Sequence, residues 1–418
     1  MAQKKGFHYG WLIVAACFFI MFGAYTILMT LHSLFMTPVT TDLGISIEAF
    51  SFVFAIGGIG VAVGSSFMGK LLAKGNMKLI MAISVVVSGL GFMSYSLASN
   101  IVVFYIIAFI VGVSNAGFAN IPISIMLTNW FHEKKGLAMS IAFTGSGIGA
   151  ALFSPLLSSI IVDYGWRTSY VVSGIAVIVL SLPFILFLVS KHPAEKGMTA
   201  YGAGSSSAQA GATQAAAASG LTLSEAKKTP MFWIFILGMV SIALVAGGVQ
   251  MHVPSYLQSV GHTAIFAGTI VGVLSLANMF GKLILGPILD KFGTAGGAIY
   301  TGVMMTIALS ALLLAQSSGL AFVFALAYGL SIVIASVGPT FMTGDVFGRK
   351  DFGAIFGFVQ VFFVAGSSIG VIISGFIYGA TQSYTFAWIF FLALFVFGMV
   401  CILAANSMKK KYLAKAQA

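Results

Sequence analysis

Apolar residues run along this chain in twelve long stretches, separated by shorter segments that carry most of the charges, prolines and polar residues. A helix needs about 20 predominantly apolar residues to cross the roughly 30 Å hydrocarbon core of a bilayer. Each stretch meets that length, so the pattern predicts an all-α membrane protein with twelve transmembrane helices. The predicted spans are 10–36, 49–71, 79–98, 101–128, 137–161, 168–190, 231–256, 265–289, 297–317, 320–343, 353–379 and 386–407.

Composition agrees with this class and excludes others. Hydrophobic residues make up 59% of the 418 residues and charged residues only 7%, whereas a soluble domain carries about 25% charged residues. A soluble enzyme, a disordered protein and a secreted disulfide scaffold are therefore excluded. The 49 glycines favour closely packed helices over a β-barrel. Cys17 and Cys401 both lie in apolar stretches, so we expect buried thiols rather than a disulfide.

The net charge of +11 predicts an orientation and not a nucleic-acid partner. If the twelve spans are correct, all 20 Lys and Arg residues except Arg167 and Lys282 fall on the side that holds both termini. By the positive-inside rule both termini are expected in the cytoplasm. The first stretch is too long for a signal-peptide core and no cleavage pattern follows it. We therefore expect an uncleaved multi-pass protein of the cell inner (plasma) membrane.

The chain divides near its middle. Residues 202–220 are rich in Gly, Ser, Ala and Gln, which is typical of a flexible linker. Thr222 and Glu225 then have capping-box spacing, which predicts a short helix before the seventh span. The predicted organisation is a six-helix bundle at 1–190, a cytoplasmic linker loop at 191–229 and a second six-helix bundle at 230–418.

The two halves carry an internal repeat. Four residues recur at a constant offset of 217 positions, about half the chain, as expected for a duplicated six-helix unit. The glycines would let a helix end pack closely on its neighbour, and the basic turn would meet helix ends of the other half at the cytoplasmic face. The matching residues are Gly64, Gly69, Leu72 and Lys74 in the first copy and Gly281, Gly286, Leu289 and Lys291 in the second.

The second copy resembles the loop signature of the major facilitator superfamily, with Gly286, Asp290, Lys291 and Gly293 in the order Gly-x-x-x-Asp-Lys-x-Gly. This resemblance implies two six-helix halves that rock around a central site, with the loop residues, including Gly69 and Lys74, acting in the conformational change. The first copy has Ala73 where the superfamily usually has Asp, so a charge-pair latch is not expected there.

Five further motifs, in order and at the expected helix ends, are similar to those of the monocarboxylate transporter and oxalate/formate antiporter group. This narrower resemblance implies secondary transport of small organic anions. The motifs are Tyr9-Gly10-Trp11, Asn129-Trp130-Phe131, Gly165-Trp166-Arg167, His252-x-Pro254 and Asp345-Val-Phe-Gly348.

Lys282 is the most informative candidate for binding. All nine Asp and Glu residues fall in loops or at span ends, whereas Lys282 lies eight residues before Asp290, about 12 Å into the membrane. A lysine at that depth costs at least about 2.5–3.5 kcal/mol and normally faces a cavity or a partner. A substrate anion is the expected partner; the alternative is that its long side chain reaches the cytoplasmic interface.

The resemblance sharpens this interpretation. Relatives commonly have at the position of Lys282 an arginine that binds the substrate carboxylate. Asn278, one turn earlier, replaces an acidic residue implicated in proton coupling in several relatives, and it shares the lysine's helix face. Asn278 is expected either to hydrogen-bond the same ligand or to make an interhelical hydrogen bond. Oxalate transporters have a second basic residue in helix 11, where this chain has Val359 beside Gln360, so monocarboxylates are favoured over dicarboxylates.

Histidines and cavity helices supply the other candidates. His32 and His252 could couple substrate to protons, because histidine titrates near neutrality; the alternative for each is a structural hydrogen bond. Helices 1, 4, 7 and 10 line the cavity in this superfamily; helix packing is the simpler explanation for any one of their residues, and it is their density on these helices that favours a site. The resulting candidates are Tyr25 and Met29 in helix 1, Asn115, Phe118 and Asn120 just before a kink expected at Pro122 in helix 4, and Tyr328 and Ser336 in helix 10.

The predicted function is therefore proton symport of small, lactate- or pyruvate-like monocarboxylates around a cavity lysine. Exchange of organic anions, as in oxalate/formate antiport, stays open. An enzyme is not expected, because the spans hold no acid, no His/Cys metal cluster and no nucleotide-binding loop. The expected partners are a small carboxylate, protons or a counter-anion, and the lipid bilayer. No cofactor, metal or nucleic acid is expected, and the functional unit is predicted to be a monomer.

Overall fold

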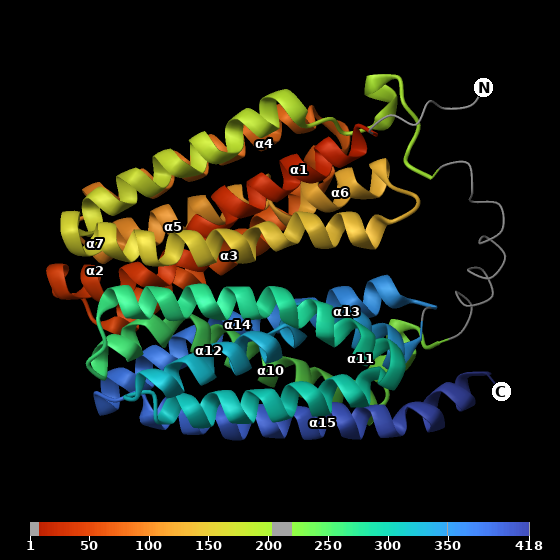
Figure 1. The fold of residues 1–418 in the computed structure, drawn as a ribbon. Coiled ribbons are helices and arrows are strands. Elements are labelled where there is room, and N and C mark those ends of the chain that lie inside the picture. The colour runs from red at the N-terminus through yellow and green to blue at the C-terminus, as the bar shows by residue number, and fades with distance from the viewer. Residues whose placement is uncertain (1–7, 203–219, 349, 418) are drawn as a thin grey trace. The chain divides into compact units, whose positions relative to one another are not determined.

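The computed structural model describes residues 8–202, 220–348 and 350–417, and helices account for most of them (Figure 1). The chain forms two compact units, one from residues 1–45 and 56–208 and the other from residues 46–55 and 209–418. Lys4, Lys5, Arg349 and most of the predicted 202–220 linker lie outside the described residues. The predicted boundaries of the two bundles and the linker loop stay a prediction.

The first unit begins with one long helix that is not uniformly α-helical. It consists of α1 (Gly10–Ile20), the π-helical η1 (Met21–Thr30), the 3-10 segment η2 (Leu31–Phe35) and α2 (Met36–Leu43). A π-helix is rare and is frequently found at functional sites. Because η1 has a wider turn, Tyr25 and Met29 are not on the regular α-helical turn that the sequence predicts.

Four shorter helices follow: α3 (Ile47–Lys74), α4 (Met77–Ser94, followed by η3, Tyr95–Leu97), α5 (Ile101–Asn115) and α6 (Asn120–Trp130). The first residues of α3 belong to the second unit and the rest to the first. The chain leaves helical geometry between α5 and α6, just before Pro122, whose missing N–H and ring disfavour a continuous helix. The expected kink is thus confirmed.

Helix α7 (Lys135–Leu188) is 54 residues long and would measure about 80 Å if it were straight. Gly165 interrupts it with φ 78° and ψ 163°, a conformation that only glycine adopts readily. Figure 1 shows that the chain reverses between the two arms of α7, which diverge from the bend. The short η4 (Pro193–Lys196) follows.

The second unit begins with α9 (Leu223–Lys227), whose predicted capping box is confirmed: the Glu225 backbone donates to Thr222 Oγ1, and the Thr222 backbone donates to Glu225 Oε2. The hydrogen bonds from Thr222 hold the pKa of the Glu225 carboxyl below its ordinary value. The long helices are α10 (Pro230–Ser259), α11 (Ala264–Leu313), α12 (Ser318–Ile332), α13 (Ile334–Phe347), α14 (Phe352–Thr381) and α15 (Thr385–Gln417).

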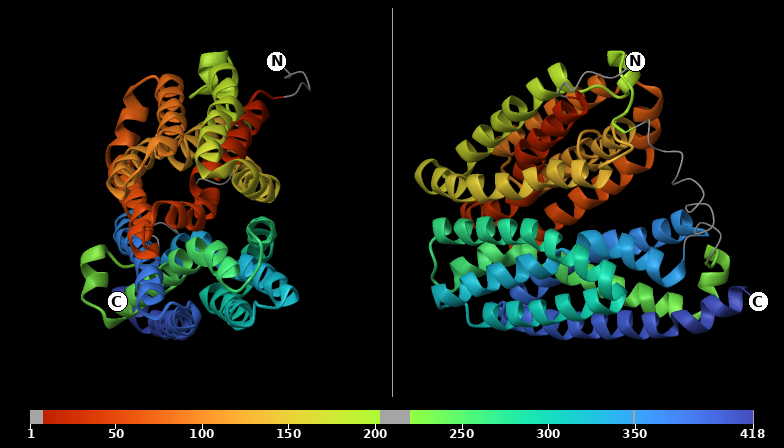
Figure 2. Two further views of the ribbon diagram at one scale, coloured as in Figure 1. Left: turned by 90° about the vertical axis from the view of Figure 1, so that its left-hand side faces the viewer. Right: turned by 45° about the vertical axis from the view of Figure 1, so that its right-hand side comes forward.

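Helix α11 repeats the geometry of α7. It is 50 residues long and is interrupted at Gly293, with φ 62° and ψ −161°. Within the described part of the chain, ten helices are long and apolar enough to cross a membrane. Dividing α7 at Gly165 and α11 at Gly293 would give twelve segments, and the count of twelve stays a prediction. Within each unit the helices run roughly along a common direction (Figure 2).

Glycines bring neighbouring helices into close contact, as their abundance suggests. In the second unit, α10 and α14 meet where a Cβ on Gly247 would collide with the carbonyl of Ser367, and one on Gly370 with the carbonyl of Leu244. The two helix backbones touch at this crossing, and no larger residue fits there without separating them.

Candidate functional site

Lys282 lies on the inward face of the first arm of α11. Ser275 and Leu289, seven residues to either side, share its helix face and are buried. The opposite face carries Phe280 and Ile284, which are 53% and 42% exposed. Lys282 itself is only partly buried. Its side chain therefore emerges from the packed face of α11 and not from the face that presents apolar side chains to the lipid.

No hydrogen bond or ion pair of Lys282 is found among the residues that the structure describes, and the same holds for the side chain of the partly buried Asn278. An ammonium group has three N–H donors to satisfy. The pair thus offers a positive charge and an amide, one turn apart, to a further ligand.

Tyr328 lies in α12 beside the same part of α11. A Cβ on the next residue, Gly329, would lie 2.9 Å from the backbone nitrogen of Asn278, so α12 and α11 touch at this level. Tyr328 is fully buried, and its hydroxyl donates to the carbonyl of Ala246 in α10 at 3.3 Å. Its ring and hydroxyl therefore pack among α10, α11 and α12.

His252 has a complete set of hydrogen-bond partners. Its Nε2 lies 3.0 Å from the Val371 carbonyl and 3.3 Å from Ser51 Oγ, and its Nδ1 lies 3.1 Å from the Tyr384 hydroxyl. A carbonyl only accepts, so Nε2 carries the proton and Nδ1 accepts from Tyr384. This arrangement supports the structural alternative for His252.

His32 occupies an aromatic cluster in the first unit. Its Nε2 lies 3.2 Å from the Tyr170 hydroxyl, and its ring centroid lies 5.2 Å from that of Phe92 and 5.3 Å from that of Tyr95. The histidine is buried.

The remaining candidates of the first unit differ in exposure. Tyr25 and Met29 are partly buried in η1, Phe118 is fully buried, and Asn120 is exposed as the first residue of α6. The fully buried Phe118 ring serves packing within its own unit. The grouping of these residues with Lys282 around one cavity stays a prediction.

The repeated loop residues divide into packed and open positions. A Cβ on Gly64 would lie 3.0 Å from the Cα of Val113, and one on Gly281 would lie 2.7 Å from a methyl group of Val333. At Gly69 and Gly286 it would meet no described atom within 4 Å. The expected close packing is thus made by Gly64 and Gly281, and for Gly69 and Gly286 it stays a prediction.

The charged residues of the same loops lie on the surface. Lys74, Asp290 and Lys291 are exposed, and Lys291 Nζ lies 5.2 Å from the centroid of the Phe292 ring. Gly293 supplies the positive φ at which α11 reverses. Their predicted pairing with helix ends of the other half stays a prediction.

Two of the five motifs hold the end of α7. The Tyr9 hydroxyl donates to the Leu188 carbonyl at 3.1 Å, Trp130 Nε1 to the Ser190 carbonyl at 2.8 Å, and Asn129 Nδ2 to the Lys191 carbonyl at 3.0 Å. The last carbonyls of a helix have no partner within the helix itself. These side chains therefore fix the chain as it leaves α7.

In two further motifs, a carboxylate connects helix ends through hydrogen bonds and ion pairs. Trp166 and Arg167 donate to Asp42 Oδ2 at 3.0 and 2.6 Å. In the second unit, Asp345 accepts from Thr294 Oγ1 at 2.7 Å and forms an ion pair with Lys409. Asp345 thereby connects α13 to the second arm of α11 and to α15.

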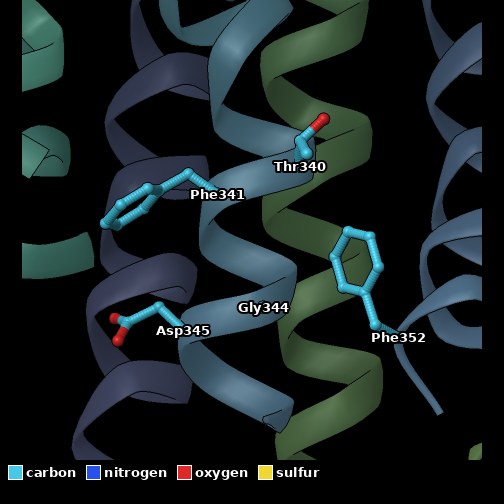
Figure 3. Close-up of a pocket in the computed structure, with 5 residues that line it drawn as sticks. All are labelled: Thr340, Phe341, Gly344, Asp345 and Phe352. Atoms are coloured by element: carbon cyan, nitrogen blue, oxygen red, sulfur yellow. The ribbon is translucent and has the colours of Figure 1, made fainter. Parts of the chain in front are cut away.

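Asp345 also lines a cavity of about 580 Å³. Figure 3 shows Phe341 and Asp345 on one side of α13, and Thr340 and Phe352 on the other. None of the predicted substrate-binding residues is among the described residues that line this cavity.

Two polar side chains in the spans have unsatisfied atoms; Asn115 was among the predicted cavity residues and Gln360 was not. Asn115 Nδ2 and Gln360 Oε1 are buried and have no hydrogen-bond partner in the described structure. A buried polar atom without a partner costs about 1–3 kcal/mol, which makes both amides candidates for contact with a ligand. The sequence did contain a signal for both residues, namely an amide side chain within a long apolar stretch.

Among the described residues no group of three or more His, Cys, Asp or Glu could hold a metal ion.

The sequence of residues 12–343 matches the Major Facilitator Superfamily model. The chain belongs to this superfamily of membrane transporters, and the predicted fold class is confirmed.

Individual relatives agree with this assignment. The uncharacterized MFS-type transporter YhjX of Escherichia coli is 24% identical over 342 residues, which cover 80% of each chain. Monocarboxylate transporter 13 of Rattus norvegicus is 23% identical over 405 residues, covering 91% of this chain and 85% of its own. The crystal structure of the nucleoside transporter NupG superposes with a TM-score of 0.73 at 13% identity, covering 96% of this chain and 99% of its own, which shows the fold alone.

Proposed function

We propose that this transporter carries small monocarboxylates by proton symport, with alternating access around Lys282. The observation that carries the proposal is a lysine on the inward face of a membrane helix, with no protein partner among the described residues. The relatives named monocarboxylate transporters, of which number 13 spans nearly the whole chain, support the same substrate class.

The chemistry of Lys282 suits a single carboxylate. A charge-assisted hydrogen bond between an ammonium and a carboxylate is about twice as strong as a neutral one. Val359, where oxalate transporters have a second basic residue, is fully buried. Asn278 and Gln360 add neutral amides, which can orient a carboxylate or an adjacent oxygen without adding charge.

Alternating access follows from the charge balance. An unliganded ammonium is costly in the low dielectric of the membrane, and a bound carboxylate neutralises it. We propose that the empty, charged site hinders the switch between faces and that the neutral complex permits it. Lysine lacks the bidentate fork of arginine, so the site holds its substrate by charge more than by planar geometry.

The coupling ion separates symport from the alternative, exchange of organic anions. The spans hold no carboxylate away from their ends, so a proton would enter with the substrate, which is protonated at its own carboxylate, or through His32. An exchanger needs no proton and requires an anion on both sides.

The test is uptake of labelled lactate, pyruvate, acetate, formate and oxalate into proteoliposomes, with and without an inward proton gradient. Symport predicts monocarboxylate uptake that rises with the gradient. Uptake only into vesicles preloaded with another anion would establish exchange instead. No uptake of any acid would refute the substrate class.

Variants test the lysine itself. Removing one partner of a buried charged pair costs about 2–5 kcal/mol, so Lys282→Gln should lower uptake by at least about 30-fold. Lys282→Arg should retain part of it, because the charge is kept. Lys410→Gln removes an exposed lysine of α15 and serves as the matched control, with uptake unchanged. Full uptake by Lys282→Gln would refute the proposed role of Lys282.

A further inference from the structure

A second cavity lies in the first unit, at the end of the bundle predicted to be cytoplasmic. It has a volume of about 590 Å³ and opens where α3 ends, α4 begins and the chain leaves α7. A cavity of this size accommodates a small ligand. Its lining residues are Lys74, Gly75, Asn76, Met77, Lys78, Val189, Ser190, Lys191, Glu195 and Lys196.

The lining is strongly positive. It has four lysines and a single carboxylate, Glu195. That carboxylate accepts hydrogen bonds from Ser190 Oγ at 2.7 Å and from the Lys191 backbone at 3.1 Å, both through Oε2. Glu195 therefore shapes the turn after α7 and leaves a net charge of about +3 on the walls of the cavity.

Two of the lysines are positioned by helix carbonyls. Lys78 Nζ donates to the Leu186 carbonyl at 2.8 Å, and Lys191 Nζ donates to the Leu72 carbonyl at 2.9 Å. Both carbonyls belong to the last turn of a helix, where cations are favoured. A carbonyl carries no formal charge and uses one of the three N–H donors of an ammonium. Lys78 thus keeps its charge and two further donors.

A second wall of the cavity is formed by the chain just after α7, and side chains of α6 and Tyr9 hold it in place. Trp130 and Asn129 bind the carbonyls of Ser190 and Lys191, and Lys196 Nζ lies 5.2 Å from the centroid of the Tyr9 ring. The cavity is therefore formed by fixed backbone on two sides, and does not depend on a mobile loop to assemble it.

Exposed apolar side chains lead directly away from the cavity along the membrane-spanning helices. Leu71 is 47% exposed one turn before Lys74, Leu79 is 56% exposed next to Lys78, and Phe187 is 77% exposed next to the carbonyl that binds Lys78. A ligand that matches both features needs an anionic head and apolar chains.

From this juxtaposition we propose that the cavity binds the phosphate headgroup of an anionic membrane lipid, with the acyl chains lying on the face of Leu71, Leu79 and Phe187. A soluble phosphate shares the headgroup chemistry but would leave that face unused. The lipid would tie together the ends of α3, α4 and α7 by bridging their lysines.

The first test uses the unaltered, delipidated full chain in detergent. Native mass spectrometry compares retention of phosphatidylglycerol with that of phosphatidylcholine carrying the same acyl chains. We expect one phosphatidylglycerol to bind at least about tenfold more tightly, with the difference falling as salt is added. Equal retention of the two lipids would overturn the proposal.

Variants then locate the site. Each lysine near an anionic headgroup contributes roughly a fivefold gain in affinity, so Lys74→Gln combined with Lys78→Gln should weaken binding by about 30-fold. Lys134→Gln combined with Lys135→Gln removes the same charge from the same end of the unit but outside the cavity, and should change little. If both pairs of substitutions weakened lipid binding equally, the lipid would be attracted to the charged surface in general, and the proposed location of the site would be refuted. If the first pair fails to fold, the lipid comparison on the unaltered protein still decides.

Soluble competitors distinguish a lipid from a free phosphate. Glycerol phosphate and inorganic phosphate are added to the complex of the full chain with phosphatidylglycerol. We expect displacement only at more than about a hundredfold excess, because neither contacts the apolar face. Displacement of the lipid by an equal concentration of either competitor would refute the lipid as the ligand and indicate a soluble phosphate.

Discussion

The crossing of α10 and α14 allows a sharp test of the packing in the second unit. We expect Gly370→Ala to destabilise the protein, and Gly357→Ala, in the same helix, to leave it equally or more stable. A Cβ at Gly357 would meet no described atom within 4 Å, whereas one at Gly370 would enter the backbone of Leu244. Both variants replace glycine by alanine in the same helix, and they differ only in what the added methyl group contacts.

The magnitude follows from the distances. A Cβ on Gly370 would lie 2.8 Å from the carbonyl carbon of Leu244, where ordinary contact begins near 3.4 Å. The helices must therefore separate by roughly 0.6 Å or more. Overpacking of this kind costs about 1–3 kcal/mol, and a backbone neighbour that cannot rotate away favours the upper end. Alanine has a helix propensity about 1 kcal/mol more favourable than glycine. The net loss in the free energy of unfolding is therefore about 2 kcal/mol for Gly370→Ala.

The two cysteines provide the assay. Both thiols are buried, so a thiol-reactive dye reports unfolding, and in a Cys17→Ala background only Cys401 in α15 remains. With about 2–4 °C per kcal/mol for a unit of this size, Gly370→Ala should lower the unfolding midpoint by about 4–8 °C. Gly357→Ala should leave it unchanged or raise it slightly. An unchanged midpoint for Gly370→Ala, or an equal fall for both variants, would refute the close approach of α10 and α14.

Three further predictions use the same dye assay. Asp345→Asn and Lys409→Gln should each lower stability, and their double-mutant cycle should show a coupling of about 1–2 kcal/mol; additive effects would mean that the ion pair contributes nothing. Tyr384→Phe removes the hydroxyl that donates to His252 and should cost about 1 kcal/mol, while an unchanged midpoint would show that His252 is held without it. Gly293→Ala places a side chain at φ 62° and should cost about 1–3 kcal/mol; no loss would mean that the reversal of α11 tolerates other residues.

The class of fold could be predicted from the sequence because a bilayer imposes a simple length rule. The predicted spans 137–161 and 168–190 lie on either side of Gly165, and 265–289 and 297–317 lie on either side of Gly293. The apolar pattern thus located both reversals. It did not reveal that glycine makes them through a positive φ within what is otherwise continuous helix, since hydropathy carries no information on backbone dihedrals.

The details of the site were harder to predict, because they depend on partners distant in the sequence. Lys282 stood out as the one charge deep in a span, and its inward face agrees with that interpretation. The π-helical η1 around Tyr25 has no signature in composition, since it arises from packing against other helices. Gln360 was noticed beside Val359 but not predicted to bind, because only the structure shows that its Oε1 is buried without a partner.

The hydrogen bonds that hold the end of α7 have a consequence for folding during synthesis. Tyr9, at the start of the chain's first helix, and Trp130, at the end of α6, both bind carbonyls at or just beyond the end of α7. All of these residues precede the second unit's long helices in the order of synthesis. The first bundle can therefore close on itself while the ribosome is still translating the second, and its closure awaits the emergence of Ser190. In ribosome-bound chains that stop before Leu188, the hydrogen bond from Tyr9 of the first helix could not form.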